Sequence, residues 1–158
     1  MIAMGCKSWR EKLSDSKDLP RKEEITEKQS KRWGTGTIVI PSPMEVYELM
    51  SKVPAGRITT INEIRSALAK KHGATIGCPI TTGIFACIAA NAAEEERSEG
   101  KKEVMPYWRT LKQGGVINEK YPGGVGSLQK HLQEEGHRIV KRGKKYCVDD
   151  YKSVLTSF

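Results

Sequence analysis

In the middle of the chain, apolar residues recur at the three- and four-residue spacing of an α-helix. Residues 42–45 (SPME) and 60–63 (TINE) each place a hydroxyl side chain three positions before a glutamate, which is the pattern of a capping box at a helix start. The sequence therefore predicts one helix that runs to about Lys52 and a second helix that Gly73 ends.

A third predicted helix, from Thr81 or Thr82 to about Glu96, has two different faces. One face carries large apolar side chains and the other carries small ones: Ile80, Ile84 and Ile88 against Thr82, Ala86, Ala90 and Ala93. Two short helices followed by a helix with a small face favour a helix-turn-helix, in which that face approaches DNA. The alternative is that the small face packs on a neighbouring helix, and spacing alone does not separate the two.

The predicted β structure is small. Residues 37–40 form a β-rich run, and residues 137–148 (HRIVKRGKKYCV) predict a hairpin after a helix at about 126–135. From Arg138 to Lys145 the hairpin has five basic residues and no acid. It is either a wing that touches phosphates or an edge whose lysines prevent strand pairing, and the helices upstream favour the wing.

These elements predict a fold that is mostly α with small β elements, a winged helix-turn-helix-like DNA-binding domain over residues 34–158. Residues 1–33 are dense in mixed charge and predict an N-terminal extension, with an exposed helix and a poorly packed connector. We expect this extension to be separate from the domain.

Composition adds the class of partner. The chain has 158 residues and a formal net charge of +8, which favours a polyanionic partner, although many basic proteins bind no nucleic acid. Its four cysteines lack CxxC spacing, so we expect neither a metal site nor a disulfide framework. Reduced thiols and the lack of a long apolar run predict a cytoplasmic protein without a membrane span. We also expect a monomer that needs no cofactor.

Five short motifs then follow one another in a fixed order between Pro41 and His137. They are residues 53–69 (VPAGRITTINEIRSALA), 83–92 (GIFACIAANA), 106–109 (PYWR), 120–124 (KYPGG) and 134–139 (EEGHRI). Together they resemble the DNA-binding domain of the alkylguanine-DNA alkyltransferases and their alkyltransferase-like relatives. The resemblance implies that fold and double-stranded DNA, alkylated or not, as the partner.

The resemblance also implies a catalytic site that this chain has lost. Active members flip an alkylated guanine and transfer its alkyl group to a cysteine, which a histidine and a glutamate activate. Here Tyr107 stands at the cysteine position and Trp108 at the histidine position, while Glu135 remains. Phenol has a pKa near ~10 and indole accepts no proton, so we expect no alkyl transfer and treat all three as vestigial positions.

DNA-binding and pocket positions carry over from the same motifs. The resemblance implies that Thr59 and Thr60 contact phosphate and that Ile61 and Thr82 stand at the family's tyrosine and arginine positions. Further implied DNA-binding residues are Ala86 and Ala90 in the third helix, the hinge Asn91, Arg109, and Lys141, Arg142 and Lys144 of the hairpin. For Arg109, a structural role is the favoured alternative. The implied base pocket consists of Tyr107, Trp108, Tyr121, Gly123 and Gly124.

The sequence therefore predicts a non-catalytic DNA-binding protein that recognises damaged or alkylated DNA or supports DNA repair, with repair proteins as further partners. One alternative is an active methylated-DNA–protein-cysteine methyltransferase with a relocated acceptor among Cys78, Cys87 and Cys147. Another is a winged-helix regulator or a protein-interaction module without lesion preference. If Tyr107 and Trp108 point inward and close the pocket, only the DNA-binding scaffold is expected.

Overall fold

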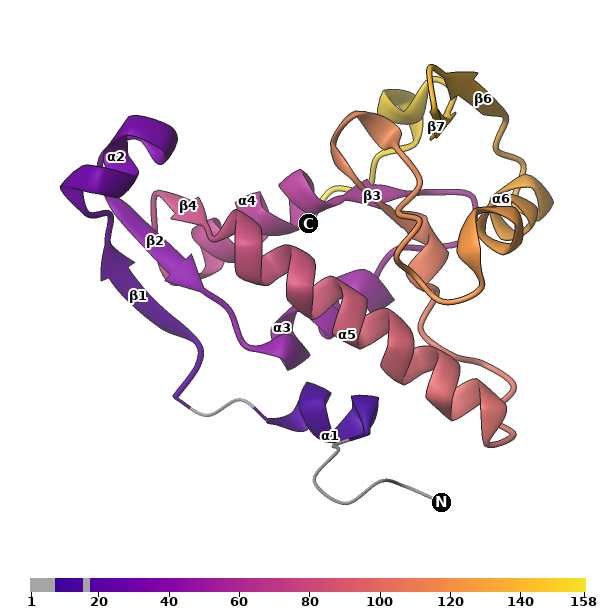
Figure 1. Ribbon diagram of the computed structural model, residues 1–158, viewed down its shortest axis with the longest axis horizontal. Coiled ribbons are helices and arrows are strands. Elements are labelled where there is room, and N and C mark those ends of the chain that lie inside the picture. The colour runs from indigo at the N-terminus through magenta and orange to yellow at the C-terminus, as the bar shows by residue number, and fades with distance from the viewer. Residues whose placement is uncertain (1–7, 16–17) are drawn as a thin grey trace.

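The computed structural model describes residues 8–15 and 18–158, and α1, α3 and α4 pack against one long central helix, α5 (Figure 1). The helices are α1 (Trp9–Ser14), α2 (Glu27–Trp33), α3 (Pro43–Ser51), α4 (Ile61–His72), α5 (Pro79–Ser98) and α6 (Gly124–Glu134). Short 3₁₀ turns cover Tyr107–Arg109, Gln113–Gly115 and Tyr151–Val154. None of the helices in the described ranges is long and apolar enough to cross a membrane.

Three small sheets hold the remaining segments. Their strands are β1 (Arg21–Glu24), β2 (Thr37–Ile40), β3 (Thr59–Thr60), β4 (Ile76–Gly77), β5 (Thr110–Leu111), β6 (Ile139–Arg142) and β7 (Lys145–Val148). The first sheet has the order β1-β2-β4, with β2 antiparallel to β1 and parallel to β4. The other two sheets are the parallel pair β3-β5 and the antiparallel hairpin β6-β7, so the prediction of a mostly α chain is confirmed.

The helix limits follow the sequence signals closely. The capping box of α3 is complete, since Ser42 and Glu45 each accept the other's backbone N–H. Thr60 caps α4 through the N–H of Glu63 only, and Gly73 ends α4 in the left-handed conformation with φ 64°. The third helix is longer than predicted, because Pro79 occupies its first turn and the charged end continues to Ser98.

The small face of α5 is the centre of the hydrophobic core. Ala86, Ala89, Ala90, Ala92 and Ala93 are all fully buried, with α1, α3 and α4 packed against the helix. Small side chains let neighbouring helices approach closely, and their burial stabilises the contact. Of the two explanations for this face, packing on neighbouring helices is therefore the one that the structure shows.

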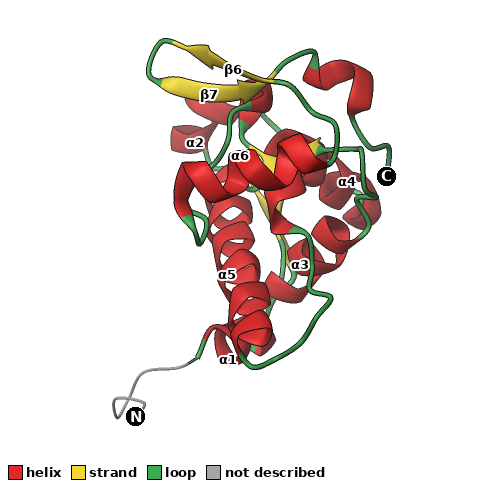
Figure 2. Ribbon diagram, turned by 90° about the vertical axis from the view of Figure 1, so that its right-hand side faces the viewer, coloured by secondary structure: helices red, strands yellow, loops and turns green. Residues whose placement is uncertain are grey.

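Residues 8–33 are joined to the rest of the fold at two places. Leu13 of α1 is only 5% exposed and belongs to the main core, and β1 pairs with β2 along its whole length. Figure 2 shows α1 lying against α5, at the opposite end of the view from the β6-β7 hairpin. The prediction of an exposed helix with a poorly packed connector holds for α2, which buries no residue, and is wrong for α1.

The predicted C-terminal hairpin is confirmed. Arg142 pairs with Lys145 across a turn in which Gly143 has φ 65°, a value that glycine adopts without strain. On its other side, β7 is bridged to the loop after β5, where Val116 pairs with Cys147. The hairpin is therefore held against the loop that follows Leu111 and does not project freely.

Replacing Leu13 by alanine tests whether α1 belongs to the folded core. We expect Leu13→Ala to lower the free energy of unfolding by about 2–3 kcal/mol, because it leaves a cavity among buried apolar side chains. Glu24→Ala, on the exposed strand β1, is the control and should change it by less than about 0.5 kcal/mol. Equal unfolding curves in urea for Leu13→Ala and wild type would contradict the packing of α1.

Candidate nucleic-acid interface

Tyr107, at the position of the family's acceptor cysteine, is a core residue. Its ring is 2% exposed and meets Trp108 and Tyr121 edge to face, with centroids 5.5 and 6.1 Å away. The hydroxyl donates to Oε2 of Glu94 at 3.2 Å. Burial, followed by the charge of Glu94, raises the pKa of Tyr107 to about 12, so the phenol stays protonated at neutral pH.

Trp108 and Glu135 do not converge on Tyr107. The Trp108 indole stacks on the His131 ring with centroids 4.2 Å apart and planes inclined by 13°. Glu135 instead binds the Arg109 guanidinium, with Nε 2.9 and 3.0 Å and Nη2 2.5 Å from its carboxylate oxygens. The three vestigial positions thus form no proton-transfer arrangement.

Arg109 has the structural role that the sequence favoured. Besides its bidentate pair with Glu135, its Nη1 donates to the backbone carbonyl of Val53 at 2.8 Å. Both charged side chains are only 14% exposed. One guanidinium therefore ties the turn that carries Tyr107 to the end of α6 and to the loop after α3, and it is not available to DNA.

The residues of the expected base pocket pack on one another. Tyr121 is 3% exposed, and burial raises the pKa of its phenol. Gly123 has φ 91°, and a Cβ there would lie 2.9 Å from the side chain of Ser127, so the turn into α6 requires glycine at this position. Gly124 is the first residue of α6, so the local structure accounts for both glycines of the pair. The position expected to receive a base is filled by Tyr107 and Tyr121.

The rings at residues 107 and 108 border a different depression. It has a volume of about 440 Å³ and is lined by Glu94, Arg97, Lys102, Glu103, Val104, Pro106, Tyr107, Trp108, Arg109 and His131. Acidic and basic side chains alternate around it, and Arg97 already pairs with Glu94. This mixed charge does not select an anionic ligand.

The face of α5 predicted to approach DNA is buried in this structure. Thr82, Ala86 and Ala90 are completely buried, because this face packs in the core. Asn91 is not a hinge in this structure, since α5 continues past it and its Nδ2 donates to the carbonyl of Cys87 at 2.8 Å.

The threonine pair before α4 is also inaccessible. Thr59 is fully buried and Thr60 is 4% exposed, because strand β3 pairs with β5 in the interior. The Thr60 hydroxyl caps α4. Neither side chain reaches the surface where a phosphate would lie, so the expected phosphate contact by these hydroxyls is not available.

The solvent face of α5 borders an apolar groove with two lysines. The groove has a volume of about 460 Å³ and is lined by Trp9, Ile61, Ile80, Gly83, Ile84, Cys87, Ile88, Lys112, Asn118 and Lys120. Ile80 and Ile84 are 54% and 52% exposed, which is unusual for isoleucine. Lys112 and Lys120 give the lining its charge, and it contains no acidic residue of the described chain. We call this the α5 groove.

Part of the α5 groove follows from the sequence. Ile80, Ile84 and Ile88 lie on one predicted helix face, but a line of isoleucines is normally the buried face of a helix. The family resemblance points to Ile61. Trp9 and Asn118 carried no signal, since each comes from a segment whose position only the folded chain defines.

The basic hairpin adjoins the α5 groove through Lys112. Lys112 also lines a hollow of about 140 Å³ with Lys144 and Lys145 of the hairpin. Lys141 and Arg142 are exposed, and Arg142 makes only a loose pair with Asp149 at 3.8 Å. The three predicted hairpin cations therefore lie at the surface, and Lys144 shares the hollow with Lys112 and with the acidic Glu119.

Of the three cysteines in the described ranges, Cys87 lines the α5 groove. Its Sγ lies 4.0 Å from Nδ2 of Asn118, whereas Cys78 and Cys147 are buried. Burial raises the pKa of the Cys87 thiol, against the smaller opposing effect of Lys120 and Asn118. A raised pKa makes this thiol a weak nucleophile at neutral pH. Among the described residues, no three His, Cys, Asp or Glu side chains are grouped as a metal site would require.

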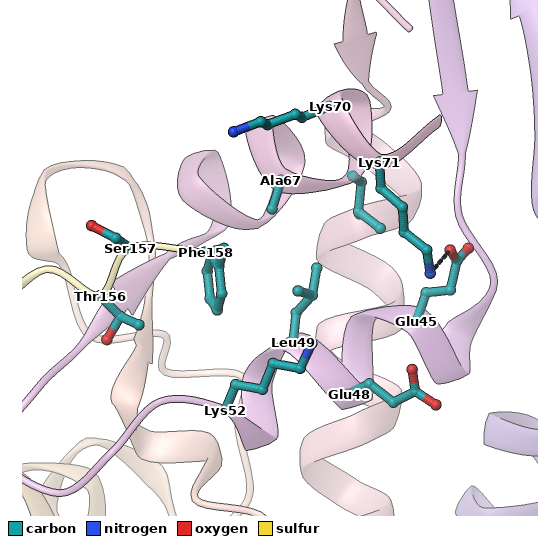
Figure 3. Close-up of a pocket in the computed structure, with 11 residues that line it drawn as sticks. Glu45, Glu48, Leu49, Lys52, Ala67, Lys70, Lys71, Thr156, Ser157 and Phe158 are labelled. Atoms are coloured by element: carbon teal, nitrogen blue, oxygen red, sulfur yellow. Dashed lines mark hydrogen bonds and ion pairs between the residues drawn. The ribbon is translucent and has the colours of Figure 1, made fainter. Parts of the chain in front are cut away.

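Another depression lies away from these elements, between α3, α4 and the C-terminal residues (Figure 3). It measures about 660 Å³, with Leu49, Leu68 and Phe158 among its lining. Glu45 on its rim is held by Lys71 at 2.8 Å and by His72 at 2.7 Å. The carboxylates that line this depression are accompanied by lysines, so the charge of the depression favours no class of ligand.

Comparison with solved structures identifies a similar fold. One is S. pombe ATL in complex with DNA, with a TM-score of 0.50, 15% identity, and coverage of 73% of this chain and 94% of that chain. Another is S. pombe Atl1 in complex with damaged DNA containing O6-carboxymethylguanine, with a TM-score of 0.48, 18% identity and the same coverage. No family model and no curated protein matches the chain. At this identity the likeness establishes the fold.

Breaking the Arg109–Glu135 pair tests its structural role. We expect Arg109→Ala to lower the free energy of unfolding by about 3 kcal/mol, because it leaves a largely buried carboxylate without its partner. Arg97→Ala is the matched control, because Arg97 pairs with Glu94 while its side chain is 52% exposed. This variant should lower the free energy of unfolding by about 1 kcal/mol or less. Similar unfolding free energies for the two variants would show that Arg109 has no special structural role.

Proposed function

We propose that this chain binds double-stranded DNA through the α5 groove and the adjoining basic hairpin. The observation that carries the proposal is the composition of the groove: exposed isoleucines together with Lys112 and Lys120, with no acid in the described lining. Basic side chains beside a surface-exposed helix suit a phosphate backbone, and apolar side chains on that helix suit base edges or steps. In this proposal α4 and α5 act as the helix-turn-helix and β6-β7 as the wing.

Because the expected base pocket is filled, the proposed role is DNA binding by the scaffold in support of repair, without catalysis and without a lesion held in that pocket. A protein of similar fold, S. pombe Atl1, was solved with DNA that contains O6-carboxymethylguanine. In this chain the acceptor position is taken by a buried phenol that bonds to Glu94, and the pocket position behind it is filled. We therefore propose that a lesion is not bound between Tyr107 and Tyr121 and that no alkyl group is transferred to Tyr107.

The exposed isoleucines also favour a second candidate, a protein-interaction module. Ile80 and Ile84 form an apolar surface of the kind that partner proteins cover. The lysines distinguish the two candidates, because an apolar protein partner does not require them. Dependence of binding on salt is therefore the decisive property.

DNA binding can be measured by the anisotropy of a labelled duplex over a range of salt concentrations. We expect binding that weakens with salt, and a double variant Lys112→Ala/Lys120→Ala whose salt slope is smaller by about 2, one for each lost phosphate contact. The control is Lys28→Ala/Lys31→Ala, which removes the same charge from the exposed helix α2. Absence of DNA binding at low salt would refute the proposal and favour the interaction module.

The absence of alkyl transfer can be measured with a duplex that carries labelled 6-O-methylguanine. We expect no label on the protein after prolonged incubation, because the Tyr107 phenol is buried and protonated. Label that survives denaturation would contradict this expectation. If Cys87→Ser then abolished the labelling, the acceptor would have moved to the α5 groove.

A further inference from the structure

A hollow of about 250 Å³ lies between α4 and the short strand β4, which packs against that helix (Figure 1). Its polar lining consists of Asn62, Arg65 and Ser66 of α4 and Thr75 of the turn before β4. No aspartate or glutamate of the described chain lines it, and it shares no lining residue with the α5 groove. We call it the Arg65 hollow.

Arg65 is a half-buried cation that pairs with no carboxylate of the described chain. Its Nε donates to the backbone carbonyl of Gly77 at 2.9 Å, and its Nη1 reaches Oδ1 of Asn62 at 3.5 Å. Burial lowers the pKa of this guanidinium, which still carries its charge at neutral pH. A charge taken partly out of water is costly unless an opposite charge meets it. An anion from outside the chain would therefore stabilise this position.

The guanidinium is held in one orientation by the close approach of β4 to α4. A Cβ at Gly77 would lie 2.6 Å from the backbone oxygen of Arg65, so only glycine lets the two segments come this near. The Gly77 carbonyl occupies the Nε–H alone, and Nη2 has no partner among the described residues. A structural role at Gly77 thus accounts for one donor of the fork and leaves the others for a ligand.

Neutral donors surround this cation on two sides. Oγ1 of Thr75 accepts the backbone N–H of Thr37 at 3.0 Å, so its hydroxyl hydrogen is left to donate. Across from it on α4, the Asn62 amide and the Ser66 hydroxyl donate to no acceptor in the described part of the chain. The hollow therefore offers hydrogen-bond donors and a positive charge, with no acid to repel an anion.

These properties match a phosphate group. A guanidinium fork fits two phosphate oxygens, and donors on a second side suit the third terminal oxygen of a monoester. The volume of about 250 Å³ lies below the roughly 300–1,000 Å³ of sites that enclose a whole small molecule, and no aromatic side chain lines the hollow to hold a base. The hollow is thus of a size for the phosphate and not for a complete nucleotide.

We propose that the Arg65 hollow binds the terminal phosphate of a phosphate monoester, with the guanidinium on two of its oxygens and the Ser66 and Thr75 hydroxyls on the third. The site goes beyond the proposed function, because it uses no residue of the α5 groove and does not require DNA binding. Such a phosphate has two sources, a small phosphorylated molecule or the phosphorylated end of a DNA strand.

Two-dimensional amide NMR spectra, recorded at constant ionic strength, test the site with methyl phosphate as the monoester and dimethyl phosphate as the diester. We expect methyl phosphate to shift the amide signals of Ser66, Thr75 and Gly77 in a saturable way. Dimethyl phosphate should bind more weakly by about threefold or more, because it has one fewer terminal oxygen and less charge. Shifts that do not saturate, or that fall elsewhere, overturn the site. Equal affinities for the two probes overturn the monoester as its ligand.

Three variants assign the binding to Arg65. Arg65→Gln should weaken methyl phosphate binding by roughly tenfold or more, which is the order of a lost charge-assisted contact. Ser66→Ala, at an exposed helical position that leaves the fold intact, should weaken it by about threefold. Arg57→Gln is the control, because Arg57 is exposed, also donates to a backbone carbonyl, that of Leu155, and does not line the hollow. Unchanged affinity in Arg65→Gln or Ser66→Ala, or an equal loss in Arg57→Gln, overturns the inference.

Duplexes with a 5′-phosphate or a 5′-hydroxyl end distinguish the two sources by anisotropy. A preference for the phosphorylated end that Arg65→Gln removes assigns the site to DNA ends. Equal affinities, together with binding of methyl phosphate, assign it to a small phosphorylated molecule, and both results support the site. Failure to bind either duplex at low salt overturns the proposed function, while methyl phosphate binding would still support the Arg65 hollow.

Discussion

Burial of the alanine face of α5 is the constraint on which the rest of the structure depends. α3 and α4 can pack closely on this helix only because the residues between them are small, and every one of those alanines is removed from solvent. Once this face is inside, the other face must be outside. The exposure of Ile80 and Ile84, and the existence of the α5 groove, follow from that packing.

The same core accounts for the residues at the positions that the family resemblance assigned to a catalytic site. Tyr107 and Tyr121 fill an interior position, and the Arg109–Glu135 pair fixes the turn that carries Tyr107. A tyrosine in place of a small thiol adds a ring that must be buried or must face water, and here it is buried and bonded to Glu94. The two rings pack against each other in the core, so the space between them is filled.

The surface beside α5 is assembled from segments that are distant in the sequence. α1 contributes Trp9, the loop after β5 contributes Lys112 and Lys120, and Lys144 of the hairpin shares a hollow with Lys112. Each segment is fixed by its own contacts: Glu95 holds the start of α1, and Cys147 of β7 pairs with Val116. A binding surface built on such supports presents its side chains in a defined arrangement, which reduces the ordering that binding would require.

The sequence by itself determined the local structure. Capping residues and terminal glycines placed α3, α4 and α6 within a few residues, and alternation with a central glycine placed the β6-β7 hairpin, because these signals act over a few neighbouring positions. It also showed that Tyr107 and Trp108 cannot perform the family's proton transfer, since that follows from the chemistry of their side chains alone.

Only the tertiary structure decided which face of α5 is exposed, because a small-residue face and an isoleucine face have the same period and either can be buried. It likewise decided that Arg109 belongs to Glu135, 26 positions away, and that Trp9 reaches a groove made by residues 61–120. These relations depend on how separate elements compete for burial in one core, and no short segment of the sequence contains that information.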